Sequence, residues 1–407
     1  MNIVMVIPTY WGRKRGDGYK TGDAIYDHPT PLDEEGTLIR LLKSLKILKD
    51  KNFEVVILAI PIATDLEDTM TKKILRTVEK IKEGVKFNLL FPNQVRKLKN
   101  ILTEKRKDRY IPLIGYKGYP EVRNLGLIAA RILSADLVIM IDDDEIFEDP
   151  FFIEKAKEFI GLEKDGKKVL GIGGYYINPN GNYNIKKEIK PWMAYWNKAQ
   201  IMNQAFDKII GQPPRYKLTP FVFGGNMIIH KELFTHIPFD PAITRGEDID
   251  YLINARMFCY NIYLDNLLSI KHDPPPKFHP QWRQLREDIY RFIFEREKLR
   301  KQRPITGMQL VTPEDLDPYP GFFLRDDLEE KVFKSNMMLG MDAITSNDKE
   351  TYYESMKNIL ISVTDAYPKN DPFENLLKLK EDWELLMHYL GEEKVKKEIK
   401  ERLLFGL

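Results

Sequence analysis

The sequence predicts an α/β protein in which a mixed, mostly parallel sheet carries helices on both faces and a helical lobe follows. Short apolar runs alternate with amphipathic segments of helical length from Asn2 to Ile270, and such alternation is typical of right-handed βαβ crossovers. After Pro276 the apolar runs stop, and charged segments of helical periodicity continue to Leu404. We therefore expect two domains, residues 1–277 and residues 278–407.

Each element follows from a local pattern. The first strand is expected at Asn2–Pro8, because proline removes a donor from the ladder and ends the strand there. A helix with leucines on one face follows at Glu34–Lys49. The charged segment Arg96–Arg109 interrupts the alternation and is interpreted as a surface insertion, helical or loose. The other strands are expected at 53–60, 86–91, 137–141, 169–176, 221–230 and 261–270, and the other helices at 66–82, 120–131, 151–160, 251–260 and 278–303.

The composition of the 407-residue chain excludes several classes of protein. A net charge of +2 gives no indication of nucleic-acid binding. The single cysteine, Cys259, excludes an intramolecular disulfide and a multi-cysteine zinc site, and it favours a reducing cytoplasm. The N-terminus lacks the basic start of a signal peptide, and no apolar run approaches the about 18 residues of a membrane span. The excess of lysine and glutamate is compatible with a thermophile protein.

The stretch Leu137–Ile141 reads as a buried strand, and four consecutive carboxylates, Asp142 to Glu145, follow it. Ligands of open α/β sheets bind just beyond the carboxyl ends of the strands. Carboxylates with no basic neighbour repel one another unless a cation joins them, and their oxygens suit Mg²⁺ or Mn²⁺. The alternative interpretation is an acidic loop or the cap of the helix that follows.

Further polar residues stand at strand ends and helix starts. Glu247, Asp248 and Asp250 open a helix, and His272 ends a strand. A lone histidine in such a place is more often satisfied by hydrogen bonds than by a metal. Two aspartates and a distal histidine, however, leave coordination positions open for a diphosphate. Arg123 lies in the first turn of a helix, where it opposes the helix dipole, and this indicates an anion nearby.

Five short segments occur in an order that matches the motifs of one enzyme family. They are Val6–Tyr10, similar to a first strand that touches the nucleoside; Val122–Leu127, similar to an "RNxGL" helix start; Ile141–Glu145, similar to an Asp-x-Asp motif; and Phe223–Lys231 with Gly246–Asp250, similar to a glycine-rich acceptor strand and a "GED" element. By these segments the chain resembles the GT-A glycosyltransferases, Rossmann-like nucleotide-diphospho-sugar transferases, and especially their family-2 group. Each motif is short, but five in register are a specific signal.

The resemblance implies roles for the matching residues. Asp144 would hold a divalent metal, Mn²⁺ or Mg²⁺, on the donor diphosphate, with Asp142 on the ribose or the metal and His272 as a further ligand. Asp248 or Glu247 would deprotonate the acceptor hydroxyl of an inverting enzyme. The implied nucleotide-sugar contacts are Pro8, Thr9, Tyr10, Arg123, Asn124, Asp142 and Asp143, and the implied acceptor contacts are Gly224, Gly225 and Asn226. The implied donor is a UDP- or GDP-sugar, and the implied acceptor is a hydroxyl of a small molecule or glycan.

Two features depart from the family pattern and leave alternatives open. Family members carry acids just after the second strand, whereas Ala59–Asp65 offers only Asp65, so the nucleoside stays open. The long loop Trp11–Asp33 holds a basic, glycine-bearing cluster that suits a diphosphate or a charged acceptor, or is a solvated loop. The alternative functions are a sugar-nucleotide-forming nucleotidyltransferase and a non-catalytic carbohydrate- or nucleotide-binding protein.

Two apolar segments have more than one interpretation. Glu384–Leu407 is apolar on one face and lysine-rich on the other. Packing against the helical lobe or a second subunit, which would make a homo-oligomer, is favoured over a peripheral membrane contact. The aromatic residues Trp192, Tyr195 and Trp196 are interpreted as core or interface residues rather than as a sugar platform.

Overall fold

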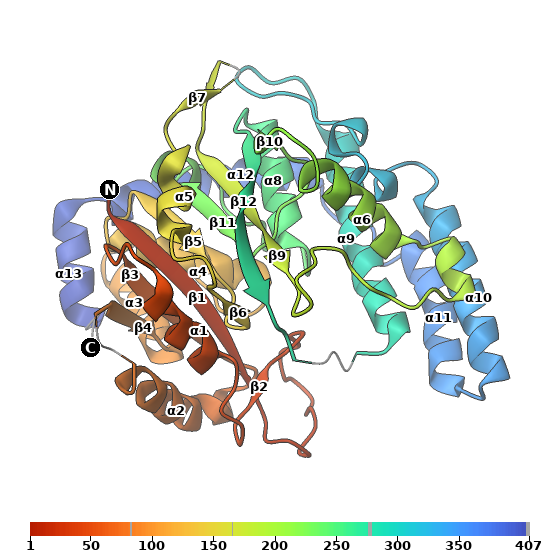
Figure 1. Cartoon of the computed structure of the whole chain (residues 1–407), viewed down its shortest axis with the longest axis horizontal. Helices are drawn as coiled ribbons and strands as arrows, with labels where there is room; N and C mark the ends of the chain where they lie inside the picture. The colour runs from red at the N-terminus through yellow and green to blue at the C-terminus, as the bar shows by residue number, and fades with distance from the viewer. Residues whose placement is uncertain (82–83, 165, 276–278, 404–407) are drawn as a thin grey trace.

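The computed structural model describes residues 1–81, 84–164, 166–275 and 279–403. Its main sheet has the strand order β10-β12-β9-β11-β5-β1-β3-β4, with β2 paired to β1 and β6 paired to β12 (Figure 1). The strands β5, β1, β3 and β4 are parallel, β11 runs antiparallel between β5 and β9, and β9 and β12 are parallel. The predicted mixed, mostly parallel sheet is therefore confirmed.

The bounds of the elements are as follows. The strands are β1 (Ile3–Gly12), β2 (Thr30–Pro31), β3 (Glu54–Pro61), β4 (Lys86–Leu90), β5 (Leu137–Met140), β6 (Glu145–Ile146), β7 (Glu163–Lys164), β8 (Lys167–Lys168), β9 (Gly171–Ile177), β10 (Tyr216–Leu218), β11 (Met227–His230) and β12 (Ile262–His272). The α-helices are α1 (Leu38–Ser44), α2 (Glu67–Glu79), α3 (Pro92–Glu104), α4 (Tyr119–Ile132), α5 (Phe152–Glu158), α6 (Lys198–Ile209), α7 (Lys231–Phe234), α8 (Glu247–Met257), α9 (Gln281–Lys301), α10 (Leu328–Thr345), α11 (Lys349–Val363), α12 (Pro372–Leu390) and α13 (Glu393–Leu403). A short 3₁₀ helix, η4 (Pro191–Ala194), precedes α6.

The first strand continues past the proline that was expected to end it. The Val6 carbonyl accepts a hydrogen bond from Ile141 on the β5 side, and the Trp11 carbonyl accepts one from Ile62 on the β3 side. Alternation along a strand therefore turns the nitrogen of Pro8 toward β5. Strand β5 pairs with β1 only as far as Val6. No carbonyl of β5 therefore needs a donor at Pro8, and the proline is tolerated there as it is at a sheet edge.

Helices cover both faces of the sheet, as expected. Because β5 lies on the opposite side of β1 from β3 and β4, right-handed crossovers place α4 on the face opposite to α1 and α2. Figure 1 shows α1 in front of the sheet and α4 behind it. The segment Arg96–Arg109 is not a loose insertion. Most of it belongs to α3, which buries Val95, Leu98, Ile101 and Leu102 while its charged residues face outward.

Two elements near the predicted acceptor motif have bounds that differ from those expected. The expected strand at 221–230 is only β11, and residues 221–226 form an irregular approach to it. The helix expected at 251–260 begins four residues earlier, at Glu247, behind Gly246 with φ 74°. Glycine adopts this left-handed conformation without strain, so the turn brings the acidic residues into the first helical turn.

The C-terminal helices do not all stand apart from the sheet. Helix α12 packs on α4, and α13 packs on α3 and α4, whereas α10 and α11 pair with each other and project to one side (Figure 1). The Trp383 indole donates to the Phe234 carbonyl at 2.8 Å, and Ile399 and Leu403 of α13 are buried. The apolar face of the Glu384–Leu407 segment thus packs within the chain up to residue 403, and residues 404–407 lie outside the described part.

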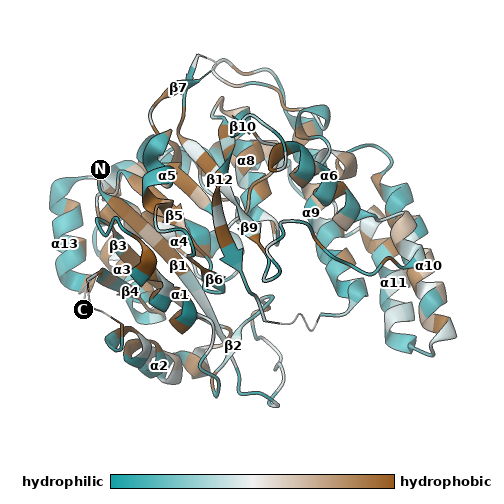
Figure 2. Cartoon of the chain, viewed as in Figure 1, coloured by the Kyte–Doolittle hydropathy of each residue, from teal (hydrophilic) through white to brown (hydrophobic). Residues whose placement is uncertain are grey.

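The expected boundary at residue 277 falls on residues 276–278, which also lie outside the described part, so the division into domains remains a prediction. Figure 2 shows apolar residues concentrated in β1, β5 and β11, with polar residues on the outer faces of α2 and α13 (Figure 2). In the ranges that the structure describes, no helix combines the length and the apolar character needed to cross a bilayer.

Candidate active site

A cavity of about 780 Å³ opens beyond the carboxyl ends of β1 and β5. This volume lies within the range of about 300–1,000 Å³ that small-molecule sites occupy. Ten of the predicted site residues line it: Pro8, Tyr10, Arg123, Asp142, Asp143, Asp144, Gly224, Glu247, Asp248 and His272. The sheet therefore brings the acidic strand end to one cavity with the start of α8 and the end of β12, although more than a hundred residues separate the first from the other two in the sequence.

The first strand, β1, contacts the acidic turn that follows β5 through Thr9. The hydroxyl of Thr9 donates to Asp143 Oδ2 at 2.6 Å, and Thr9 itself is fully buried. Burial, and then the charge of Asp144, raise the pKa of Asp143 to about 8. Thr9 therefore contributes by positioning Asp143 and does not reach the cavity, in contrast to its expected contact with the nucleotide sugar.

Asp144 and His272 lie next to each other, and both line the cavity. His272 Nε2 lies 3.4 Å from Asp144 Oδ2, and the His272 ring stacks on Tyr176 with centroids 4.6 Å apart. Burial opposes ionisation of Asp144, but the hydrogen bond and charge of His272 outweigh it, so the pKa of Asp144 lies below its ordinary value. His28, in the loop after β1, also lines the cavity and lowers the pKa of Asp144 through its charge.

The last carboxylate of the turn, Glu145, points into the protein. Its side chain is fully buried, and its Oε2 accepts a hydrogen bond from the Asp142 backbone N–H at 3.0 Å. Burial, then the charges of Asp142 and Asp144, raise the pKa of Glu145 well above its ordinary value. A Cβ on Gly225 would come within 2.0 Å of Glu145 Oε1. Gly225 is therefore required by close packing against this carboxyl, and it does not line the cavity.

Arg123 joins the two acidic segments. Its guanidinium lies 2.8 Å from Asp142 Oδ1, and its Nε donates to Glu247 Oε1 at 3.3 Å. The anion that its position in α4 indicated is thus supplied by the protein itself. The four carboxylates after β5 were expected to have no basic neighbour, but α4 brings Arg123 to Asp142 from a distant part of the sequence. A Cβ on Gly224 would approach Arg123 Nη2 to 2.7 Å, so this glycine makes room for the guanidinium.

The start of α8 contributes two carboxylates with different surroundings. Asp248 is half-buried at the cavity, and its Oδ2 accepts the Gly224 N–H at 3.1 Å. Glu247 is buried beside Arg123, and burial, followed by the charge of Asp248, raises the pKa of Glu247 to about 7. Asp248 therefore presents its carboxylate to the cavity, whereas Glu247 is buried against Arg123.

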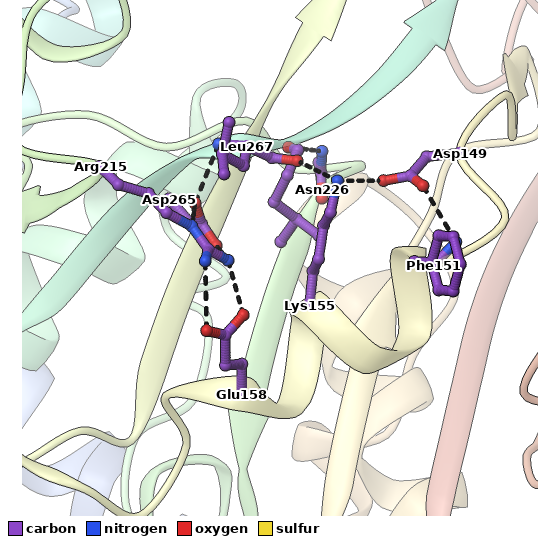
Figure 3. A network of polar contacts seen from close by, with 9 residues as sticks. Asp149, Phe151, Lys155, Glu158, Arg215, Asn226, Asp265 and Leu267 are labelled. Carbon is purple, nitrogen blue, oxygen red and sulfur yellow. Dashed lines mark hydrogen bonds and ion pairs between the residues drawn. The ribbon is translucent and has the colours of Figure 1, made fainter.

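Two predicted contacts, Asn124 and Asn226, are engaged with backbone elsewhere. The Asn124 amide exchanges two hydrogen bonds of 2.8 Å with the backbone of Phe239. The Asn226 amide donates to the carbonyls of Tyr175 and Leu268 at 3.2 and 3.1 Å. Figure 3 shows Asn226 beside this backbone, next to the Lys155 contact with Leu267 (Figure 3). Both asparagines hold loops and strands together, and the structure does not place either on the cavity.

Two arginines of the loop Trp11–Asp33, Arg13 and Arg15, form ion pairs within the protein. Arg13 pairs with Asp23 and with Asp65, each at 2.7 Å, which fastens the loop to the end of β3. Asp65, the acid considered for nucleoside recognition, is therefore engaged by Arg13. The ring of Tyr26 packs against Tyr10 with centroids 4.3 Å apart, so this end of the loop lies against the cavity wall, whereas residues 14–22 are exposed, as the solvated-loop alternative expects.

Several residues of the cavity were not anticipated. Trp192 and Trp196 are buried, as expected for core residues, yet both also line the cavity, whereas Tyr195 is 41% exposed. Lys198 and Arg291 line it as well, from α6 and α9. No local pattern distinguishes such residues from an ordinary amphipathic helix, because only the packing of α9 against α8 brings Arg291 to the site.

The donor atoms at the cavity suit a divalent metal that takes few protein ligands. Within the described ranges, no three His, Cys, Asp or Glu side chains are arranged so as to hold a metal ion. Asp144 and His272 nevertheless offer an oxygen and a nitrogen 3.4 Å apart. Mg²⁺ and Mn²⁺ commonly take one or two protein ligands and complete their shell with substrate phosphates and water. Asp144 and His272 therefore fit such an ion, whereas Asp142, assigned to the ribose or the metal, is already paired with Arg123.

Structural comparison finds similar chains, while no protein-family model and no curated protein matches the sequence. A mannosyltransferase from Pyrobaculum calidifontis, solved with GDP-Man and Mn²⁺, shares 10% identity over 96% of this chain and 86% of its own, with a TM-score of 0.46. Glucosyl-3-phosphoglycerate synthase from Mycobacterium tuberculosis, solved with Mn²⁺, UDP and phosphoglyceric acid, shares 16% identity over 70% and 73%, with a TM-score of 0.35. GalNAc-T7, solved with UDP, GalNAc and Mn²⁺, shares 12% identity over 90% and 58%, with a TM-score of 0.40.

These similar structures are glycosyltransferases, the enzyme class that the sequence motifs resemble. Every TM-score given lies below 0.5, so these similarities assign no function to this chain.

Proposed function

We propose that this chain is a metal-dependent glycosyltransferase that moves a sugar from a UDP- or GDP-sugar to an acceptor hydroxyl, with inversion at the anomeric carbon. The observation that carries the proposal is the sharing of one cavity by two acidic sites. One is the pair Asp144 and His272, suited to a diphosphate-bound cation, and the other is Asp248, which is half-buried at the start of α8. Transfer of a glycosyl group needs both of these functions in one place.

The chemistry assigns a different task to each site. The acceptor oxygen forms a bond to the anomeric carbon, the bond from that carbon to the diphosphate oxygen breaks, and its electron pair leaves with the diphosphate. Asp248 takes the proton of the acceptor hydroxyl. A metal bound at Asp144 and His272 would neutralise charge on the leaving diphosphate. Arg123 holds Asp142 and Glu247, which lie near these residues in the chain, and it lines the same cavity.

The environment of α8 favours Asp248 over Glu247 as the base. Glu247 is 7% exposed and bonded to Arg123, so an acceptor hydroxyl reaches it poorly. Asp248 lies open to the cavity, and the Gly224 N–H at 3.1 Å orients its carboxylate. Direct attack by a hydroxyl that Asp248 deprotonates is a single displacement, and a single displacement inverts the anomeric carbon.

The nucleotidyltransferase alternative is less well supported. Such an enzyme needs basic side chains and backbone N–H groups free to cradle a triphosphate after the first strand. Arg13 is bonded to Asp23 and Asp65, and Arg15 is paired with Glu34. A carbohydrate- or nucleotide-binding protein without activity remains the second alternative, and only turnover distinguishes it.

The test is a panel of UDP- and GDP-sugars incubated with the purified chain and Mn²⁺, with release of nucleoside diphosphate as the readout. We expect slow metal-dependent hydrolysis of one donor, abolished by a chelator. Consumption of nucleoside triphosphate with release of pyrophosphate would instead identify a nucleotidyltransferase. A thermal shift with nucleotide sugar but no product in either assay would identify a binding protein. The anomeric configuration of the transferred sugar, followed by NMR, tests inversion.

A further inference from the structure

Helices α10 and α11 form a hairpin that projects to one side of the molecule and bears several exposed apolar side chains (Figure 1). Six large apolar residues of this hairpin are each 51–68% exposed. Single exposed apolar residues are ordinary on a protein surface, whereas a cluster of them marks an interaction site. We call the surface that these six residues form the outer face of the hairpin: Phe333, Met341 and Ile344 on α10, and Tyr353, Leu360 and Val363 on α11.

The six residues lie along one seam between the two helices. Gly340 of α10 contacts Met356 of α11, since a Cβ on Gly340 would lie 2.7 Å from Met356 Cε. The exposed residues of α11 stand three, four and seven positions from Met356. Two of those on α10 stand four and seven positions from Gly340, and the third, Met341, directly follows it. Residues at spacings of three, four and seven share one side of a helix, so both stripes border the contact of Gly340 with Met356.

This seam faces away from α9. Asn358 lies two positions from both Met356 and Leu360, which places it on the opposite side of α11. Its amide donates to the Trp282 carbonyl of α9 at 2.8 Å and to Asn336 Oδ1 of α10 at 2.9 Å. Helix α9 thus covers the side of the hairpin that holds Asn358 and leaves the outer face exposed.

The polarity of the hairpin is the reverse of that of an ordinary surface element. Alongside apolar residues, its buried side includes five serine and asparagine side chains, none more than 1% exposed: Ser335, Asn336, Ser355, Asn358 and Ser362. Surface helices normally turn such residues to solvent and large apolar ones to the core. The exposure of the large apolar side chains here favours an outer face that another molecule covers in solution.

The charge of the hairpin argues against a membrane or a nucleic acid as that molecule. Residues 328–363 contain six Asp or Glu and four Lys, so their net charge is −2. Anionic lipids and nucleic acids attract lysine-rich surfaces and repel acidic ones. Glu330 and Lys334, which lie beside the stripe on α10, form an ion pair with each other. The charge therefore favours an apolar protein surface as the occupant.

The size of the outer face fits a second copy of the same hairpin. The two helices have 18 and 15 residues, so they are about 22–27 Å long and together about 20 Å wide. Two copies would bury about 1,000 Å² in total, the area at which specific interfaces begin. Two such layers make a four-helix bundle, and a twofold axis lets the same face serve on both copies. A single partner helix, about 10 Å wide, would cover only half of that width.

We propose that this chain forms a homodimer in which the outer faces of two hairpins pack against each other as a four-helix bundle. The dimer is independent of the proposed function, because the six residues of the outer face do not line the cavity. It also uses a surface different from the apolar face of α13, whose Ile399 and Leu403 are buried within the chain.

Sedimentation of the purified chain tests the dimer. We expect a monomer–dimer equilibrium with a dissociation constant between about 1 and 100 μM, because an interface of this area gives weak rather than permanent association. Sedimentation velocity at protein concentrations that span this range measures the equilibrium. A monomer at every concentration overturns the proposal.

A charge placed on the outer face should prevent association. Leu360→Glu should weaken the dimer at least about tenfold, because a twofold interface buries the new carboxylate twice. Met341→Glu tests the stripe on α10 in the same way. Leu310→Glu is the matched control, since Leu310 is 52% exposed in the loop after α9, outside the hairpin. Circular dichroism verifies that the three variants are folded. An unchanged dimer in both hairpin variants, or an equal loss in the control, contradicts the proposal.

Flotation with phospholipid vesicles tests the other occupant. The vesicles contain phosphatidylcholine alone or phosphatidylcholine with anionic phosphatidylglycerol, and we expect the chain to bind neither. Flotation of the unaltered chain that Leu360→Glu abolishes would assign the outer face to lipid and overturn the dimer. Hydrolysis of the nucleotide sugar depends on the cavity alone, so its absence would remove the proposed function and leave the dimer standing, whereas a monomeric chain would leave the proposed function as it was measured.

Discussion

The acidic turn after β5 and the acidic start of α8 are the two carboxylate clusters of the cavity, and they neutralise their buried members differently. Each places more than one carboxylate along the cavity, including Asp144 in the turn and Asp248 in the helix. In each, another is fully buried. Burial and the charges of Asp142 and Asp144 raise the pKa of Glu145, which favours its protonated form. Asp250 instead meets the ammonium of Lys298 at 2.6 Å.

The difference follows from the elements that surround each cluster. The turn after β5 is enclosed by the Gly225 backbone and Tyr176, which offer no cation to Glu145. Helix α8 packs on α9, whose Lys298 is fully buried between Asp240 and Asp250 and also donates to Asn254. The carboxylates proposed for catalysis therefore lie next to two different kinds of buried group, one a carboxyl with a raised pKa and one an ion pair. Arg123 connects the two clusters at their outer members.

The largest expected effect is on the helix cluster. Asp248→Asn should lower the transfer rate by about 10²–10⁴-fold, because a positioned base supplies that factor. Binding of the nucleotide sugar should change little, as measured by titration calorimetry. A variant with an unchanged transfer rate would remove Asp248 from the role of base, and a large loss in Glu247→Gln alone would transfer that role to its neighbour.

The second prediction concerns the buried cation beside the same cluster, Lys298. Lys298→Met should lower the free energy of unfolding by about 3–5 kcal/mol, because it leaves Asp240 and Asp250 buried without their cation. Chemical denaturation measures this change. Lys157→Met is the matched control, since Lys157 is paired with Asp50 at the surface and its loss should change stability by less than about 1 kcal/mol. Similar losses in both variants would show that the buried charge network matters no more than a surface pair.

The third prediction concerns the turn cluster. Asp144→Ala should weaken the apparent affinity for Mn²⁺ by about 100-fold, judged from the metal dependence of nucleoside diphosphate release, because it removes one of two proposed ligands. Glu148→Gln serves as the control, since Glu148 is a nearby exposed acid paired with Lys271. An unchanged metal dependence in Asp144→Ala would exclude Asp144 as a ligand.

The smallest expected effect is on the pH dependence of stability. The folded pKa of Glu247, about 7, lies above the ordinary value of 4.5. The folded state therefore binds more protons than the unfolded state between these values, and stability falls as pH rises from about 4.5 to 7. Glu247→Gln should make this slope less steep, by at most about 1.4 kcal/mol per pH unit. Denaturation curves at pH 5, 6 and 7 measure it, and an identical slope in the variant would place the titration elsewhere.

Predictions from periodicity held where the pattern reflects burial of a single element. The β3 and β4 strands, and the α2 and α4 helices, lie close to where alternating apolar runs placed them. Predictions failed where the contacts of a residue depend on other elements of the fold. Pro8 does not end β1, because the strand that would have needed its missing N–H has already ended. The charged segment after β4 is helical, one of the two forms expected, but it is not a surface insertion, because its apolar side chains pack into the core.

The candidate site was predictable in its chemistry and less so in its membership. The sequence pattern placed Asp144, His272, Glu247 and Asp248 at strand ends and helix starts, and the structure brings all four to one cavity. The pattern also selected Asn124 and Asn226, whose amides are occupied by backbone carbonyls and N–H groups that lie far away in the chain. A sequence motif shows which side chains are present, but not which of their hydrogen bonds are already made.

The sequence by itself determined the order of strands and helices and the positions of the carboxylates, because both depend on the identities of neighbouring residues. Only the tertiary structure decided which carboxylates line the cavity and which are buried beside a cation. Arg123 reaches Asp142 and Glu247, and Lys298 reaches Asp240 and Asp250, through the packing of helices that are distant in sequence. Ionisation depends on burial and on neighbouring charges in space, and these are set by how the elements pack.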